Sequence, residues 1–175
     1  MPADRLDPAA FIKDVPDFPK KGIVFKDITP LLADPAAFAA ALDRMAEPFR
    51  GAGIRYVAGI ESRGFLLAAP LACRLGAGLV PIRKKGKLPR QTKSASYDLE
   101  YGQDSIEAHV DAFPAGAKVL LVDDVLATGG TAKAACELIE AIGGQVAGVS
   151  LLIELGFLNG RAKLAGRDVR ALVKY

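Results

Sequence analysis

Residues 119–131 read VLLVDDVLATGGT, and this stretch decides the fold class. Its first four residues, Val119–Val122, form a continuous apolar run directly after Lys118. Such a run is typical of a strand buried inside a parallel sheet. The stretch then passes through small residues to Gly130, where we expect a helix to begin. A strand that ends in polar residues just before a helix is where open α/β sheets bind their ligands.

The rest of the chain shows the same alternation of strands and helices. We expect strands over residues 55–60, 79–82, 106–110 (at an edge), 118–122 and 146–152, and helices that begin at Asp7-Pro8 and span 35–47, 64–75 and 130–142. This order predicts an α/β fold in which a mostly parallel twisted sheet is flanked by helices. Because the sequence shows no internal repeat and no linker-like run, we expect a single domain over residues 1–175.

The composition excludes several classes of protein. With 175 residues, of which 51% are hydrophobic and 25% charged, the chain can form a core and is not a disordered tail. Two cysteines and one histidine are too few for a disulfide framework or a zinc quartet. The longest uncharged stretch, residues 141–153, is shorter than the roughly 20 residues of a membrane span. An apolar export signal is absent before Phe11, so we expect a cytoplasmic protein.

The positive charge is concentrated in one place. The net charge is +3, from 23 basic and 20 acidic residues. Residues 83–93 contain six basic residues and no acid, and without them 17 basic residues face 20 acidic ones, a net charge of −3. The basic stretch therefore indicates a local anion-binding site rather than a nucleic-acid-binding surface.

The segment Ala127–Thr131 has the features of a phosphate cradle. Gly129 and Gly130 allow backbone N–H groups to approach an anion, and the expected helix adds the partial positive charge of its N-terminus. The hydroxyls of Thr128 and Thr131 can donate to the same anion. The segment is not a Walker A loop, because no Gly-Lys-Ser or Gly-Lys-Thr is present.

Two carboxylates, Asp123 and Asp124, stand directly before this cradle. Like charges so close together repel each other unless hydroxyl groups or a metal ion lie between them. A ribose 5-phosphate satisfies both features, with its phosphate in the cradle and its hydroxyls on the carboxylates. The alternative is an ordinary turn from strand to helix with solvated acidic side chains.

The stretch 119–131 resembles the phosphoribosyl pyrophosphate (PRPP) binding motif of the type I phosphoribosyltransferases. Four other stretches, in the family's order, resemble its adenine-specific branch; they are 22–29 (GIVFKDIT), 61–65 (ESRGF), 83–89 (RKKGKLP) and 97–102 (YDLEYG). The resemblance implies the type I phosphoribosyltransferase fold, with a flexible hood loop and an N-terminal base-binding cap. It also implies a purine-salvage reaction in which PRPP and adenine give AMP and pyrophosphate.

The resemblance assigns roles to individual residues. It implies catalytic roles for Glu100, Asp123 and Asp124, and 5-phosphate binding by Ala127, Thr128, Gly129, Gly130 and Thr131. Pyrophosphate binding is implied for Glu61, Ser62, Arg63, Arg83, Lys84 and Lys87. Arg63 suits that role by its chemistry, because a guanidinium can donate two parallel hydrogen bonds to a pyrophosphate.

Base recognition and cofactors also follow from the resemblance. It implies adenine binding by Val24, Phe25, Lys26 and Leu158, with the backbone of Val24 and Lys26 facing the base edge and Phe25 stacking on the ring. Val24 and Phe25 could instead be core residues. We expect Mg²⁺ as cofactor, held mainly by PRPP oxygens and water with no direct protein ligand. The implied partners are PRPP, adenine, AMP, pyrophosphate and a second copy of the chain, with no nucleic acid and no membrane.

Two alternatives stay open at this point. One is a related enzyme that uses the same PRPP site with a 6-oxopurine such as hypoxanthine, guanine or xanthine. The other is a protein without catalytic activity that binds PRPP or a nucleotide and regulates transcription. The segment 27–29 favours the adenine branch, and Arg63, Lys87 and Glu100 favour an enzyme.

Overall fold

A computed structural model describes residues 6–99 and 102–175. Its contacts divide the chain into two compact units, one up to Arg44 and the other Met45–Tyr175, and each is described by itself. In the part of the chain that the structure describes, no helix is long and apolar enough to cross a membrane.

The first unit contains a small antiparallel sheet. After a 3₁₀ turn at Pro8–Phe11, strand β1 (Lys13–Pro16) pairs with β2 (Val24–Asp27), so that Lys13 lies opposite Asp27. The helix α1 (Thr29–Ala33) follows at once, and α2 (Pro35–Ala46) begins in this unit. The expected cap of α2 is confirmed, because the Asp34 carboxylate accepts hydrogen bonds from the first N–H groups of the helix.

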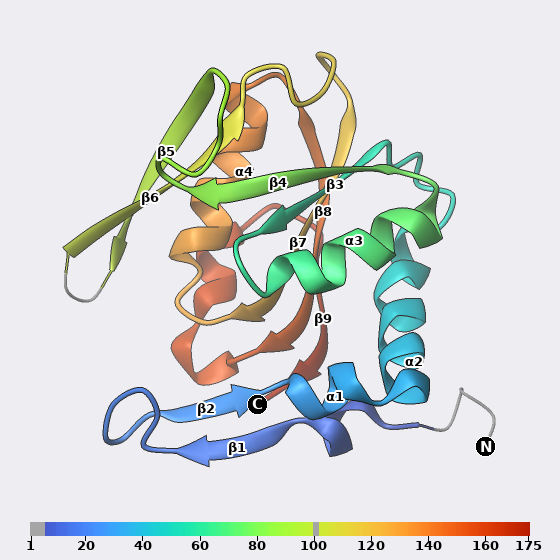
Figure 1. Ribbon diagram of the computed structural model, residues 1–175, viewed down its shortest axis with the longest axis vertical. Helices are drawn as coiled ribbons and strands as arrows, with labels where there is room; N and C mark the ends of the chain where they lie inside the picture. The colour runs from blue at the N-terminus through green and yellow to red at the C-terminus, as the bar shows by residue number, and fades with distance from the viewer. Residues whose placement is uncertain (1–5, 100–101) are drawn as a thin grey trace. The chain divides into compact units, whose positions relative to one another are not determined.

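The second unit is built around a seven-stranded sheet (Figure 1). Its strands lie in the order β5-β6-β4-β3-β7-β8-β9; their bounds are β3 (Tyr56–Ile60), β4 (Gly78–Lys84), β5 (Thr92–Leu99), β6 (Gly102–His109), β7 (Lys118–Leu126), β8 (Gln145–Glu154) and β9 (Val169–Lys174). The five strands from β4 to β9 are parallel, whereas β6 joins β4 and β5 in antiparallel pairing. The mostly parallel sheet predicted from the sequence is therefore confirmed.

Two helices, α3 (Gly64–Leu75) and α4 (Gly130–Ala141), cover opposite faces of this sheet. The unit also contains 3₁₀ segments at Glu47–Phe49, Gly156–Leu158 and Gly160–Leu164. Ala58 and Ile60 pack in one core cluster with residues of α4. Gly59, which points the other way, faces α3, and a methyl group there would lie 2.6 Å from the Ala68 Cβ. The expected end of α3 is confirmed, since Gly76 adopts the left-handed conformation.

The strand order creates a switch point between β3 and β7. From β3 the chain crosses to β4 on one side, and it later returns to β7 on the other side. The carboxyl ends of β3 and β7 are therefore neighbours, with crossover helices leaving in opposite directions. This is the position at which doubly wound sheets bind ligands.

Several elements differ from the sequence expectations, which include none of the strands β1, β2, β5 and β9. Strand β7 continues to Leu126, because the long strand β8 pairs with it up to Glu154, so Asp123 and Asp124 lie within the strand rather than after it. The expected edge strand 106–110 is part of β6, and β5 forms the edge instead. Together β5 and β6 form a hairpin that projects from the sheet, here called the hood hairpin (Figure 1).

Candidate active site

The switch point brings together two of the segments singled out in the sequence. Arg63, at the start of α3, forms an ion pair with Asp124 of β7, with 2.8 Å between Nε and Oδ2. Gly64 permits this approach, because a Cβ there would lie 2.9 Å from the Asp123 Oδ1. The segment after β3 and the end of β7 therefore form one site.

Of the two carboxylates of this site, Asp124 is buried and Asp123 is partly buried. Asp124 is 5% exposed, and Asp123 Oδ1 accepts a hydrogen bond from the Asp124 N–H at 2.9 Å. Burial raises the pKa of Asp123, and the neighbouring carboxylate raises it further. Burial also raises the pKa of Asp124, although the Arg63 guanidinium opposes this. The pair is thus poised to bind hydroxyl groups or positive charge.

The segment Ala127–Thr131, here called the glycine loop, forms a pocket. A hollow of about 70 Å³ is lined by Asp123, Val125, Leu126, the five loop residues and Ala132. Gly129 has φ +78° and stands directly before α4, so the N-terminus of the helix opens at this hollow. The structure brings all five residues of the predicted cradle together with Asp123.

Gly160 supports the glycine loop from behind, and the sequence analysis missed it. A Cβ at Gly160 would lie 2.1 Å from the Ala127 carbonyl oxygen, and a Cβ at Gly129 would lie 2.3 Å from the Gly160 carbonyl oxygen. Only glycine permits two backbones to approach so closely. The Asn159-Gly160 pair is a turn signal in the sequence, but nothing local connects it to residues thirty positions earlier.

A partly buried ion pair holds the segment that carries Gly160. Glu154, at the end of β8, is 7% exposed, and its Oε1 accepts from Arg161 Nε at 2.9 Å. Arg161 Nη1 also donates to the Val169 carbonyl at 2.7 Å. Arg161 lowers the pKa of Glu154, so the carboxylate stays ionised in this clamp.

The segment Arg83–Arg90, here called the basic turn, begins with the last two residues of β4 and continues beyond the strand. Glu61 Oε2 accepts from the Lys84 N–H at 3.0 Å and from Arg83 Nε at 3.2 Å. Burial alone would raise the pKa of Glu61, but these donors outweigh it and lower the pKa, with a smaller contribution from the Lys87 charge. The Glu61 side chain therefore ties the basic turn to the segment after β3, and Arg83 is engaged by Glu61.

Lys84 is joined to the hood hairpin through Asp104. Its Nζ lies 3.2 Å from Asp104 Oδ2, which also accepts from Tyr97 Oη at 3.2 Å. The backbone N–H of Ser105 is the main cause of the lowered Asp104 pKa, followed by Lys84. Tyr97 also forms a hydrogen bond with the Thr131 hydroxyl of the glycine loop. One polar chain thus links the glycine loop, the hood hairpin and the basic turn.

Three of the remaining predicted residues belong to the first unit. Val24, Phe25 and Lys26 are neighbours on β2 of the first unit, where the Phe25 ring packs edge-on against Phe18 at a centroid distance of 5.2 Å. The Lys26 ammonium pairs with Asp14 at 2.7 Å, so that side chain is held within its own sheet. Ser62 lies exposed between Glu61 and Arg63, and Leu158 ends a 3₁₀ segment of the second unit with 38% of its surface exposed. Glu100 lies outside the described residues.

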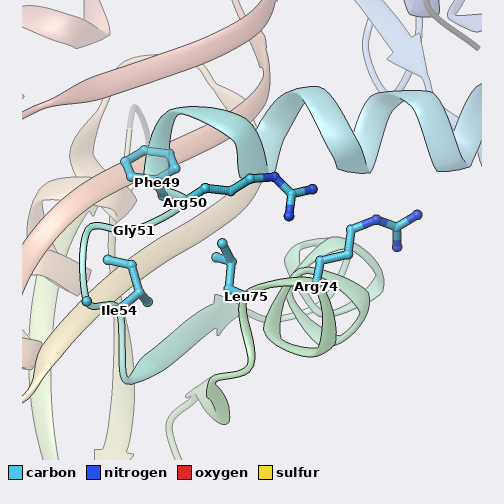
Figure 2. A pocket seen from close by; sticks show the side chains of 7 residues that line it. Phe49, Arg50, Gly51, Ile54, Arg74 and Leu75 are labelled. Atoms are coloured by element: carbon cyan, nitrogen blue, oxygen red, sulfur yellow. The ribbon is translucent and has the colours of Figure 1, made fainter.

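A second hollow occupies the opposite end of β3. It measures about 410 Å³ and is lined by Phe49, Arg50, Gly51, Gly53, Ile54, Arg74 and Leu75 (Figure 2). These residues precede β3 or end α3, whereas Glu61–Arg63 follow β3. The larger hollow is therefore remote from the carboxylates, and the candidate active site is the smaller one.

The geometry does not supply a protein cage for a metal. Among the residues that the structure describes, no group of three or more His, Cys, Asp or Glu side chains is placed to hold a metal ion. Asp124 already has a cationic partner in Arg63. A divalent cation that enters this site would need most of its ligands from the bound molecule and from water.

Comparisons with known proteins agree with this geometry. Residues 28–169 match the family model of the phosphoribosyl transferase domain. The adenine phosphoribosyltransferase of Thermobifida fusca is 59% identical over 162 residues, which are 93% of this chain and 92% of that protein. The crystal structure of the Rhodothermus marinus adenine phosphoribosyltransferase has a TM-score of 0.91 at 52% identity, covering 95% of both chains. The Saccharomyces cerevisiae enzyme, crystallised with an imino-altritol bisphosphate and adenine, has a TM-score of 0.88 at 41% identity, covering 93% and 94%.

Proposed function

Since the chain belongs to the phosphoribosyltransferase family, and within it to the adenine phosphoribosyltransferases that convert PRPP and adenine to AMP and pyrophosphate, we propose how its residues divide this reaction. The observation that carries the proposal is the contact between Arg63 and Asp124. It joins the segment suited to pyrophosphate with the strand end suited to ribose. PRPP needs both groups side by side, because its pyrophosphate is bonded to the ribose.

The glycine loop binds the 5-phosphate in this proposal. The backbone N–H groups of Gly129, Gly130 and Thr131 and the threonine hydroxyls donate to the phosphate oxygens, and the N-terminus of α4 favours their charge. Asp123 and Asp124 accept hydrogen bonds from the ribose hydroxyls. Buried carboxylates need hydrogen-bond donors in place of water, and the ribose hydroxyls supply these hydrogen bonds when the ribose binds.

The carboxylates also act on the reacting carbon. A ring nitrogen of adenine forms a bond to the anomeric carbon while the bond from that carbon to the pyrophosphate oxygen breaks, and the nitrogen loses its proton. Positive charge develops on the ribose ring during this exchange, and buried carboxylates stabilise it at short range. Arg63, Lys84 and Lys87 take up the negative charge of the leaving pyrophosphate.

Mg²⁺ is the proposed cofactor. When bound, it would neutralise the charge of the leaving pyrophosphate, and Asp123 and Asp124 would hold the ribose hydroxyls beside it. The carboxylates fit this role because oxygen ligands suit a hard cation, and Asp124 is already paired with the Arg63 guanidinium at 2.8 Å.

Adenine recognition is assigned to residues of both units. We propose that the backbone of Val24 and Lys26 binds the base edge, Phe25 and Leu158 contact its faces, and Glu100 moves or shares a proton at the base. The ion pair of Lys26 with Asp14 supports the backbone assignment, since it engages the Lys26 side chain. In this proposal both units work as one catalytic domain.

We also propose that the chain works as a homodimer. Large apolar side chains are exposed on neighbouring elements of the second unit: Leu66 on α3 is 50% exposed, Leu79 on β4 is 45% exposed, and Val110 after β6 is 39% exposed. Such side chains favour burial against another protein surface. Light scattering tests this, and a monomer at micromolar concentration would contradict it.

The test of the proposed function is an initial-rate assay with PRPP, Mg²⁺ and each of adenine, hypoxanthine, guanine and xanthine. Turnover of adenine that is lost without Mg²⁺ is the expected result. Turnover of a 6-oxopurine instead would support the sister activity and reject the base assignment. Binding of PRPP without turnover of any base would reject the enzyme.

A further inference from the structure

The buried carboxylate of Glu107 has no role so far. Glu107 lies on β6 and is 4% exposed, although glutamate is rarely buried unless its charge is balanced. Its register partner on β4 is Arg83, the first residue of the basic turn. The residue therefore sits beneath the turn whose cations are proposed to bind pyrophosphate.

Glu107 accepts three backbone hydrogen bonds from consecutive residues of that turn. Its Oε1 lies 3.0 Å from the N–H nitrogen of Gly86, 3.2 Å from that of Lys87 and 3.3 Å from that of Leu88. Consecutive N–H groups converging on one point form an anion-binding nest, and Gly86, with φ +81°, permits the required turn. Glu107 Oε2 accepts a further hydrogen bond from the Thr92 hydroxyl at 3.2 Å.

Because Glu107 fills this nest, the backbone of the turn is unavailable to an external anion. The positive charge of the turn is left to its side chains. The Lys87 charge is close enough to Glu61 to lower the pKa of that carboxyl, so Lys87 acts toward the segment after β3. Arg83 Nη1 donates to the Lys87 carbonyl at 3.1 Å and fixes the turn from the other side.

We propose that Glu107 is a positioning residue for pyrophosphate, which holds the backbone of residues 86–88 so that Lys87 reaches the leaving group of PRPP. This inference rests on the proposed function. It adds a residue that touches neither substrate and acts through the turn. A charge-assisted anchor of this kind limits the backbone motion of the turn and so keeps the lysine within reach.

The test compares Glu107→Gln with Glu47→Gln, which alters an exposed glutamate paired with Arg50. In Glu107→Gln we expect the KM for PRPP and the Ki for pyrophosphate to rise about tenfold, while the KM for adenine changes less than twofold. Glu47→Gln should leave all three unchanged. Calorimetry of Mg²⁺-pyrophosphate binding to the same proteins gives a readout that needs no turnover.

A folded Glu107→Gln protein with unchanged pyrophosphate affinity would overturn the inference, as would an equal loss for adenine and PRPP. If Glu107→Gln does not fold, Thr92→Val tests the inference instead, since it removes only the hydrogen bond from the Thr92 hydroxyl to Glu107 Oε2. A selective rise of about twofold in the KM for PRPP supports the role, and an unchanged value rejects it. If the wild-type protein binds pyrophosphate but turns over no base, the proposed function alone is rejected. The role of Glu107 is then tested by calorimetry of pyrophosphate binding to the wild type and Glu107→Gln.

Discussion

The glycine loop and the basic turn are both proposed to bind phosphate groups of PRPP, and they differ in the source of their positive charge. The glycine loop contains no basic residue and offers N–H groups and a helix N-terminus. The basic turn contains Arg83, Lys84, Lys85, Lys87 and Arg90, and its own N–H nest is filled by Glu107. One site is built from backbone and the other from side chains.

The two regions are also held in place differently. The glycine loop rests on the Gly160 backbone at distances that exclude any Cβ. The basic turn is held by two acids, Glu61 after β3 and Glu107 on β6, and these two strands flank β4. In the proposed assignment, the 5-phosphate, which stays on the ribose, binds to a closely packed backbone cradle. The pyrophosphate, which must leave, binds to long side chains that can exchange partners.

The largest effect is expected from Asp124→Asn, at the point where the two regions meet. The change removes the charge that pairs with Arg63 and stabilises the ribosyl centre, so kcat should fall about 10²- to 10³-fold. Initial rates at saturating PRPP and adenine measure it. An effect below threefold would show that Asp124 does not act on the reacting carbon.

Gly160→Ala should disturb the glycine loop and leave the basic turn unchanged. The new methyl group would meet the Ala127 carbonyl at 2.1 Å, so the glycine loop must shift. We expect a loss of about 1–3 kcal/mol in unfolding free energy and a fall of about tenfold in kcat/KM for PRPP.

Gly156→Ala is the matched control for this change. Its methyl group would lie 3.2 Å from the Tyr175 carbonyl and touches no part of the glycine loop among its nearest described neighbours. Equal kinetic losses in both variants would contradict the specific role of Gly160.

Much of the glycine loop could be predicted from the sequence, because its chemistry lies in one contiguous stretch. The apolar run up to Val122, the two aspartates and the glycines are all within thirteen residues. Gly160 and Glu107 could not be found this way, because each acts through contacts with segments about 20 to 30 positions away. A single sequence carries no signal for such pairings.

The fold shows the same division between local and distant information. Helix α3 matches its predicted bounds, since its sequence contains its own stop signal at Gly76. The end of β7 was predicted four residues too early, because Asp123 and Asp124 interrupt its apolar run and only the pairing with β8 shows that the strand continues. Strand β5 is not among the strands expected from the sequence, because most of its residues are polar and only the pairing with β6 makes them a strand.

A smaller effect is expected on stability from Asp123→Asn. Burial raises the pKa of Asp123 in the folded protein, and Asp124 raises it further. Stability from this group is therefore fully present below the unfolded pKa of about 4 and is lost as the pH rises through the folded pKa. Asparagine should thus increase the free energy of unfolding at pH 8, on the order of 1 kcal/mol, although it lowers activity.

Urea denaturation at pH 8 and pH 4 measures this difference. The gain should shrink at pH 4, which lies below the raised pKa of the folded state and close to the unfolded pKa of about 4. A variant that is less stable than the wild type at pH 8 would contradict the account of the buried pair.

The smallest effect is expected from Asp104→Asn, which frees Lys84 from the hood hairpin. An ion pair whose lysine side chain is 59% exposed is weak, so the Ki for pyrophosphate should fall only about two- to fivefold. Product-inhibition kinetics measure this change. Asp111→Asn, which breaks an exposed pair with Arg90, serves as control. A weaker pyrophosphate affinity in Asp104→Asn would contradict competition for Lys84.

The most direct test of the difference between the two regions is calorimetry of two ligands, ribose 5-phosphate and Mg²⁺-pyrophosphate, with the wild type, Gly160→Ala and Glu107→Gln. The account predicts that Gly160→Ala loses affinity for ribose 5-phosphate and keeps that for pyrophosphate, and that Glu107→Gln does the reverse. Loss of both affinities in both variants would contradict it, because the two regions would then form one anion site with a common support.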